Sequence, residues 1–118
     1  MISQSFVVPS DDEVLDATGL VPTSEDDFES KTLVLNLGGE DSLKFSYSVT
    51  GRSVRLVWQR RDRPVLDLFR EGATRFGIDS RDARVTLRIE FDLEQARGAI
   101  DVVIREDGVE MQDRILLY

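Results

Sequence analysis

Strict alternation of apolar and polar residues is the feature that most limits how this chain can fold. Between residues 83 and 91 the apolar side chains occupy every second position, with charged or hydroxyl side chains between them. Residues 32–37 and 42–50 repeat the pattern with Leu, Phe, Tyr or Val. Because successive side chains of a strand point to opposite faces of a sheet, this period predicts strands that are buried on one face. Such strands are typical of antiparallel sheets.

Glycine-containing turns predict how these strands pair. Gly38-Gly39 separates the first two strands, Gly51-Arg52 predicts a two-residue hairpin turn, and Gly98 marks a later turn into a strand over 99–105. The pairs expected across Gly51-Arg52 are Val49 with Val54, Tyr47 with Leu56, and Phe45 with Trp58. All six side chains are apolar and share one face, so this register is self-consistent.

Asp107-Gly108 is the strongest hairpin signal in the chain and predicts a type I′ turn. The expected pairs are Ile104 with Met111, Ile100 with Ile115, Arg105 with Glu110, and Asp101 with Arg114. This register places Asp113 opposite Val102, on the apolar face. A carboxylate there is costly unless it is paired and can mark a functional site. A β-bulge or strand edge that turns Asp113 outward is the alternative, so its burial stays open.

One helix is predicted in the middle of the chain. Pro64 suits the first helical position after a cap at Asp62 or Arg63, and Gly77 suits the C-terminal end. The apolar residues that recur at three and four positions are Val65, Leu68, Phe69, Gly72, Ala73 and Phe76. The predicted fold is therefore α+β, β-β-β-α-β-β-β, with one central helix on one face of an antiparallel sheet of five to six strands. Trp58, Phe45, Leu87 and Phe69 are the expected core.

Residues 1–30 differ from the rest of the chain in charge and pattern. They carry eight of the 23 acidic residues and none of the 15 basic ones, so the net charge of −8 belongs to them and residues 31–118 are neutral. They show no sustained period, which predicts an acidic N-terminal arm or long loop, with its degree of order left open, beside a single domain over 31–118. One short helical turn is expected at Asp12–Ala17, capped by Ser10 or Asp11.

The absence of His and Cys from all 118 residues excludes several chemistries. A disulfide framework, a thiolate or imidazole zinc site, a Cys nucleophile and a Ser-His-Asp triad all need those side chains. The acid clusters lack the alternate ligand spacing of a calcium loop, so neither a metal nor a cofactor is predicted. We expect no enzyme, with carboxylate-based chemistry as the remaining alternative. A secretory signal and a membrane-spanning run are also missing, which predicts a cytoplasmic location without a membrane partner.

Basic residues on the predicted strands raise the question of nucleic-acid binding. They are Lys44, Arg55, Arg84, Arg88, Arg105 and Arg114. Open sheets that bind single-stranded RNA also need exposed aromatic rings, whereas the strand aromatics other than Tyr118 are predicted on the core face. The acidity of the whole chain opposes nucleic acid as well. We therefore expect no nucleic-acid partner and keep Arg55, Arg84 and Arg88 as a candidate charged sheet face.

The charge distribution favours a small acidic protein-binding module, because complementary charge selects partners and speeds association. More narrowly, it favours an inhibitor or antidote of the immunity type that covers a basic site on another protein. The candidate partner-binding residues are Asp11, Asp12, Glu13, Asp16, Glu25, Asp26, Asp27 and Glu29. The arm would either contact that basic site or fold back over Arg55, Arg84 and Arg88 and screen them. Residues 31–118 are expected to fold without residues 1–24, provided that Phe6–Val8 add no strand.

The alternative function is a structural or assembly subunit that oligomerises or pairs through an exposed sheet edge. Leu116 and Tyr118 are expected to point outward from the last strand. An apolar terminal strand is an edge that must be covered or paired. The sequence leaves the partner and the oligomeric state open.

Overall fold

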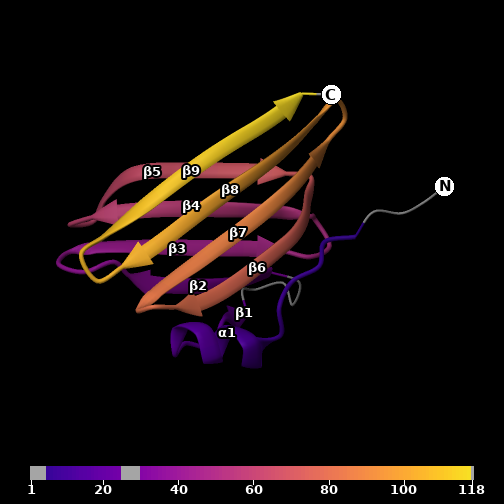
Figure 1. The fold of residues 1–118 in the computed structure, drawn as a ribbon. Helices are drawn as coiled ribbons and strands as arrows, with labels where there is room; N and C mark the ends of the chain where they lie inside the picture. Colours follow the sequence, from indigo (N-terminus) through magenta and orange to yellow (C-terminus); the bar gives the residue numbers. More distant parts are fainter. Residues whose placement is uncertain (1–4, 25–29, 118) are drawn as a thin grey trace.

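The computed structural model describes residues 5–24 and 30–117, which form two antiparallel sheets and one helix (Figure 1). The five-stranded sheet contains, in spatial order, β1 (Thr23–Ser24), β2 (Ser30–Asn36), β3 (Asp41–Ser48), β4 (Ser53–Arg60) and β5 (Arg63–Glu71). The four-stranded sheet contains β6 (Ala73–Arg81), β7 (Arg84–Leu93), β8 (Ala96–Arg105) and β9 (Gly108–Leu117). The helix α1 spans Asp11–Thr18.

The two sheets pack face to face, and the strands of the four-stranded sheet cross those of the other obliquely (Figure 1). Their facing sides form the core, in which Phe45, Leu56, Leu87, Ile89, Ile100 and Val102 are fully buried. The ring of Phe76 contacts Phe45 edge-on, with 4.8 Å between centroids, and so joins the two sheets. The alternation seen in the sequence is confirmed, because the buried side chains of β3 and β7 occupy every second position.

The predicted central helix is wrong, because residues 64–77 form β5 and the first half of β6. Leu66 and Leu68 pair with Trp58 and Leu56 of β4. Their side chains therefore alternate between faces as in a strand, although the same apolar residues also fit a helical spacing. Gly72 has a φ of +87° and carries the chain from one sheet to the other, a conformation that a helix interior does not contain. Strand pairing therefore overrides the local helical pattern.

The antiparallel character is confirmed, but the described residues form nine strands rather than five or six, and their one helix, α1, precedes the strands instead of lying between them. Phe45 and Leu87 are buried as expected, and Trp58 is partly buried against the core. The predicted burial of Phe69 is wrong. This side chain is 60% exposed on the outer face of β5, and it also breaks the expectation that strand aromatics face the core.

Both predicted hairpin registers are shifted by two residues. Ser48 pairs with Ser53 across a four-residue turn, in which the N–H of Arg52 donates to the carbonyl of Val49 at 3.3 Å. Arg105 pairs with Gly108 across Glu106-Asp107. A shift of two residues keeps every side chain on its face, which is why the buried face was still predicted correctly. Gly98 likewise lies inside β8, opposite Phe91, rather than in a turn.

The N-terminal residues are attached to the four-stranded sheet through β6. The N–H of Val7 donates to the carbonyl of Thr74 at 3.0 Å, and the N–H of Phe76 donates to the carbonyl of Val7 at 2.9 Å. Phe6 and Val14 are buried in the core. Residues 31–118 were expected to fold without residues 1–24 only if Phe6–Val8 added no strand. Val7 pairs with Arg75 of β6, so this condition is not met. The expected helical turn after Ser10 is confirmed, since α1 begins with a capping box of Ser10 and Glu13.

No helix in the described part of the chain is both long enough and apolar enough to cross a membrane.

Candidate protein-binding surface

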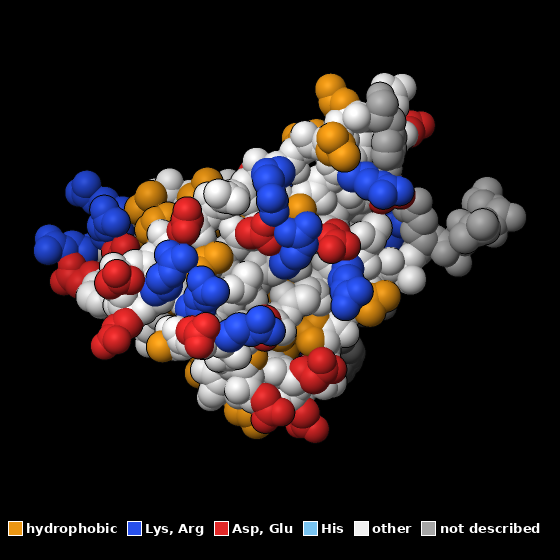
Figure 2. Space-filling model, in the orientation of Figure 1, with side chains coloured by type: hydrophobic (Ala, Val, Ile, Leu, Met, Phe, Trp, Pro, Cys, Tyr) orange, Lys and Arg blue, Asp and Glu red, His pale blue; other side chains and the backbone are white. Residues whose placement is uncertain are grey.

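The helix α1 presents acidic side chains at one end of the molecule (Figure 2). Its sequence, DDEVLDAT, buries Val14 against the sheets and leaves Asp12, Glu13 and Asp16 exposed. Three acids lie in the first turn, where the positive end of the helix dipole stabilises negative charge. The local sequence thus forms the helix and fixes which carboxylates it exposes.

Two of these carboxylates are already engaged within the chain. Lys31 Nζ donates to Asp11 Oδ1 at 2.6 Å, and the backbone N–H of Ser10 donates to Glu13 Oε1 at 3.2 Å. The carboxylates of Asp12 and Asp16 form no ion pair and no hydrogen bond with residues 5–24 or 30–117. Of the acids on α1, these two are the ones whose charge is open to a partner.

Apolar side chains lie beside these acids in the same stretch of chain. Leu15 on α1 is exposed, as are Leu20 and Val21 directly after it. We call Asp12, Leu15, Asp16, Leu20 and Val21 the α1 surface. Protein interfaces commonly combine an apolar centre with a charged rim, and this surface has that composition. The sequence identified its acids, whereas the exposure of its apolar residues depends on which side of α1 packs against β6.

The other acidic candidates, Glu25, Asp26, Asp27 and Glu29, lie outside the described residues. The candidate charged face is not a single surface. Arg55 lies on the outer face of the five-stranded sheet and contacts Asp67 through two hydrogen bonds of 3.0 and 2.7 Å. Arg84 and Arg88 lie on the outer face of the four-stranded sheet. The sequence pattern placed the three on outward faces but did not reveal that they belong to two different sheets.

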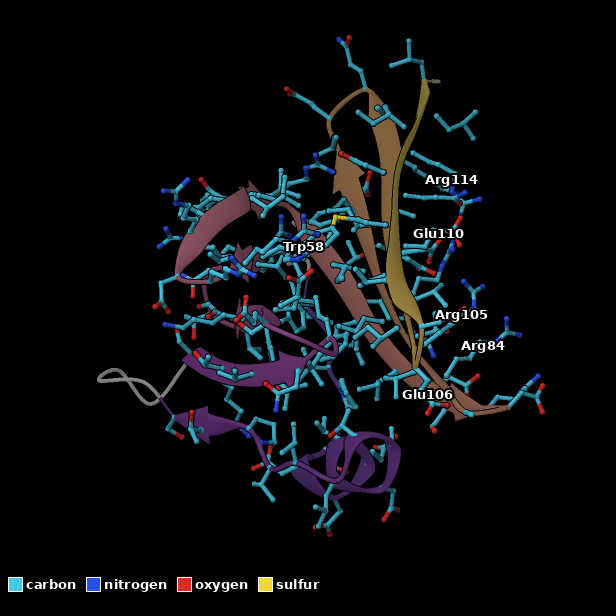
Figure 3. All side chains as sticks on the ribbon, turned by 90° about the vertical axis from the view of Figure 1, so that its left-hand side faces the viewer. Trp58, Arg84, Arg105, Glu106, Glu110 and Arg114 are labelled. Carbon is cyan, nitrogen blue, oxygen red and sulfur yellow. The ribbon has the colours of Figure 1, made fainter. Side chains whose placement is uncertain are left out.

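Opposite charges alternate across the outer face of the four-stranded sheet. Arg88 contacts Asp101 at 3.0 Å and Glu90 at 3.3 Å, and Arg114 also contacts Asp101. Arg105 contacts Glu110 at 3.5 Å. The ion pairs Asp101–Arg114 and Arg105–Glu110 expected from the sequence are therefore present, but as diagonal rather than directly opposite neighbours. Figure 3 shows Arg84, Arg105, Glu110 and Arg114 pointing away from the other sheet.

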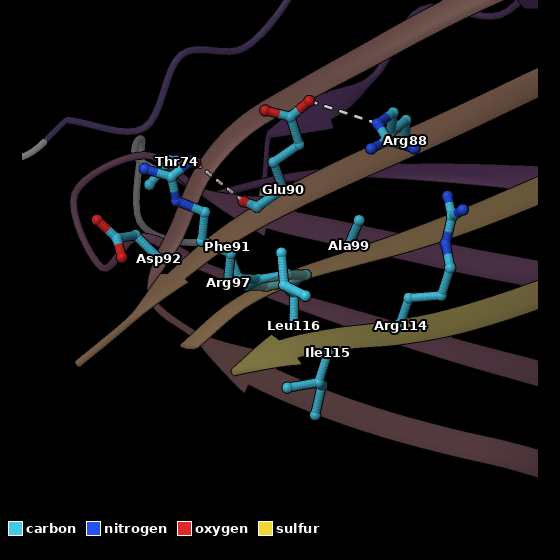
Figure 4. A pocket seen from close by; sticks show the side chains of 11 residues that line it. Thr74, Arg88, Glu90, Phe91, Asp92, Arg97, Ala99, Arg114, Ile115 and Leu116 are labelled. Atoms are coloured by element: carbon cyan, nitrogen blue, oxygen red, sulfur yellow. Dashed lines mark hydrogen bonds and ion pairs between the residues drawn. The ribbon is translucent and has the colours of Figure 1, made fainter. Parts of the chain in front are cut away.

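An open hollow of about 870 Å³ lies on this same outer face (Figure 4). The small side chain of Ala99 forms its floor, and the longer side chains of Arg88, Glu90, Arg114 and Leu116 form its walls. Arg88 and Arg114 share the carboxylate of Asp101, so the positive charge at the wall is partly balanced. No group of three or more acidic residues that could hold a metal ion occurs in the described ranges.

Asp113 lies on the inner face of β9, opposite Ile100, and no bulge turns it outward. Arg70 of β5 contacts both of its carboxylate oxygens at 2.7 Å. These hydrogen bonds lower the pKa of Asp113 below its ordinary value. The Arg70 guanidinium also lies 5.3 Å from the centre of the Phe91 ring. The carboxylate of Asp113 is therefore paired, and this ion pair links β5, at the edge of one sheet, to β9, at the edge of the other.

The sequence matches no protein-family model and no curated protein. The fold, however, is similar to a solved chain from a contact-dependent growth inhibition toxin–immunity protein complex of Klebsiella pneumoniae 342. The TM-score is 0.78 over 92% of this chain and 96% of that chain, at 17% sequence identity. At this identity the similarity establishes that the two chains share a fold over almost their whole lengths.

Proposed function

We propose that this chain is the immunity component of a toxin–immunity pair and that it binds and neutralises a toxin domain. The observation that carries the proposal is the fold similarity to a chain of such a complex, which covers nearly all of both chains. Fold similarity alone is an analogy, so the role within the pair must be argued from the residues.

The composition favours the immunity role over the toxin role. With no His and no Cys in the whole sequence, the chain lacks the side chains that most often act as general acid–base groups and activated nucleophiles. Its net charge of −8 suits an inhibitor of a basic protein, because complementary potentials speed encounter and select the partner. We place this binding in the cytoplasm, and we expect no catalytic activity from the chain itself.

We further propose that the α1 surface contacts the toxin. The carboxylates of Asp12 and Asp16 have no partner within the described ranges, so desolvating these carboxylates against basic side chains breaks no contact seen in this structure. Leu15, Leu20 and Val21 supply apolar area between the charges. The helix is held in place by Val14 in the core, so the surface is ordered before the partner arrives.

The protein encoded next to this chain's gene is the toxin candidate to test. Expressed alone, that protein should arrest growth, and co-expression with this chain should restore it. Purified together, the two should form a complex whose affinity falls as salt rises, since exposed charges are screened beyond about 8–10 Å near physiological ionic strength. Growth arrest that this chain does not relieve would reject the proposed function.

The α1 surface is tested in the same system with matched charge removal. Asp12→Asn combined with Asp16→Asn should weaken the complex about tenfold or more, mostly by slowing association. The control combines Glu71→Gln with Glu94→Gln, which removes the same charge from two exposed positions away from α1. Equal affinities for the two double variants would move the toxin contact to another surface while leaving the immunity role intact.

A further inference from the structure

The two sheets have four edge strands, and three of them are protected. β1 is two residues long, and Val7 covers part of β6 through backbone hydrogen bonds. β5 contains Pro64, which has no N–H, and its pairing with β4 is interrupted between Trp58 and Gln59. Short strands, covering segments, prolines and irregularities are the usual means by which sheet edges avoid pairing with other chains.

The edge strand β9 lacks these four protections, and its one inward-pointing charge, Asp113, is paired with Arg70. It runs for ten residues without proline or register shift. The edge of β9 that faces away from β8 has no strand partner within the described residues. Ile115 is 58% exposed even though it lies on the inner face, and Leu117 beyond it is more exposed still. A long regular edge of this kind is a template for another strand.

The sequence of β9 is complementary to itself when two copies run antiparallel about Gln112. The opposed residues are then Glu110 with Arg114, Val109 with Ile115, and Met111 with Asp113, and the two-fold axis repeats each pair. Glu110 and Arg114 lie on the outer face, as Figure 3 shows, and form an oppositely charged pair. Val109 and Ile115 lie on the inner face and form an apolar pair. An isologous two-fold interface requires this kind of self-complementarity.

Neighbouring registers lack this match. An axis at Asp113 would oppose two like charges. An axis at Met111 would set Glu110 against Gln112 and so lose the oppositely charged pair. An axis between two residues would pair inner-face with outer-face side chains, which the pleat does not allow. The Gln112 axis also engages residues 108–116, nearly the whole strand.

We propose that a second copy of this chain docks on β9, antiparallel and with Gln112 on the two-fold axis, so that two four-stranded sheets become one of eight strands. The contacts within each chain are compatible with this pairing. Arg114 keeps donors beyond those it directs to Asp101, because a guanidinium has five N–H groups. Asp113 already forms an ion pair with Arg70, so Met111 of the second copy would lie against a carboxylate whose charge is balanced. The proposal is independent of toxin binding.

A charge-swap series on the full chain tests the pairing. At increasing concentration, light scattering should show a mass approaching twice the 13.4 kDa of one chain. Glu110→Arg and Arg114→Glu should each raise the dimer dissociation constant about tenfold or more, and the double swap should restore it to within about threefold. Arg84→Glu, on the same face but away from the edge, is the control and should leave the dimer unchanged. A monomer at all concentrations overturns the proposal, and so does a double swap that fails to rescue.

The register is tested by disulfide trapping. Because the chain has no Cys of its own, any disulfide must form between the introduced residues. Directly opposed residues of antiparallel strands have Cα atoms about 4.5–5.5 Å apart, within disulfide range. Gln112→Cys should therefore cross-link rapidly under mild oxidation. Glu110→Cys, on the same strand and face, should not, since its two copies would lie about 14 Å apart. Equal cross-linking of both variants overturns the register. Protection of the β9 amides by the toxin, with no self-association, assigns the edge to the partner instead.

Discussion

Ala83 has a backbone conformation that its side chain disfavours. Asp82 and Ala83 form the two-residue turn between β6 and β7, with φ values of +54° and +60°. Left-handed conformations cost about 1–2 kcal/mol for residues with a Cβ, and glycine is free of this cost. Ala83→Gly is therefore expected to raise the free energy of unfolding by about 0.5–1 kcal/mol after the entropy of the unfolded chain is deducted. Urea titration measures this change. Ala99→Gly, inside β8, is the control and should be destabilising.

Tyr47 is a buried phenol with an unusual titration. Burial, together with the negative charge of Asp11, raises its pKa to about 12. The folded state therefore favours the neutral phenol. Its contribution to stability is complete below the unfolded pKa of about 10 and is lost as the pH rises towards 12, by about 2–3 kcal/mol.

Tyr47→Phe separates this effect from general alkaline unfolding. The hydroxyl has no hydrogen-bond partner within the described residues, so its removal should leave stability at pH 7 unchanged or slightly higher. The difference between the variant and the original chain should grow between pH 10 and 12 in urea titrations. Parallel pH profiles would show that another group carries the alkaline loss.

At the scale of the elements, the Arg70–Asp113 pair holds two edge strands together. Both carboxylate oxygens are engaged, but the Asp113 side chain is 40% exposed, so the pair is worth about 0.5–1 kcal/mol. A double-mutant cycle with Arg70→Gln and Asp113→Asn should give a coupling energy of that size. Because the pKa of Asp113 is lowered in the folded state, the coupling is present above about pH 4 and is lost as the pH falls through the folded pKa. A coupling energy that does not decrease as the pH falls below 4 would contradict this assignment.

The elements also show what the sequence could and could not predict. Alternation identified β2, β3 and β7 because a half-buried strand needs nothing beyond its own residues to reveal its period. β5 and β6 were missed because their apolar residues also fit a helical spacing. Gly72 was the contrary signal, since a glycine costs about 1 kcal/mol in a helix interior.

The candidate site divides in the same way. The capping box of Ser10 and Glu13 is local, so the start of α1 and its acids could be predicted. The separation of Arg55 from Arg84 and Arg88 could not, because the pattern says which side of a strand faces outward but not which sheet receives the strand. The Asp113 contact joins strands from different sheets and depends on tertiary packing.

For the whole molecule, the N-terminal segment is part of the folded body. Phe6 and Val14 contribute to the core, and Val7 pairs with β6. Deleting residues 1–24 should therefore lower the free energy of unfolding by about 3–5 kcal/mol, as large-to-small changes of core residues do. Urea titration of the shortened chain measures the loss. The Asp12→Asn/Asp16→Asn variant, which removes charge but no core residue, should stay within about 0.5 kcal/mol of the original. A shortened chain of undiminished stability would show that the segment is dispensable.

The order of strands has a consequence for how the chain is completed during synthesis. Within each sheet, every strand pairs with the strands next to it in the sequence, so each sheet can assemble hairpin by hairpin as the ribosome delivers it. The N-terminal segment is the exception, because its backbone partners, Thr74 and Phe76, are made some seventy residues later. Val7 therefore gains its backbone partners only after the second sheet has begun to form. A toxin that recognises the α1 surface would therefore bind fully synthesised, folded chains and not incomplete ones.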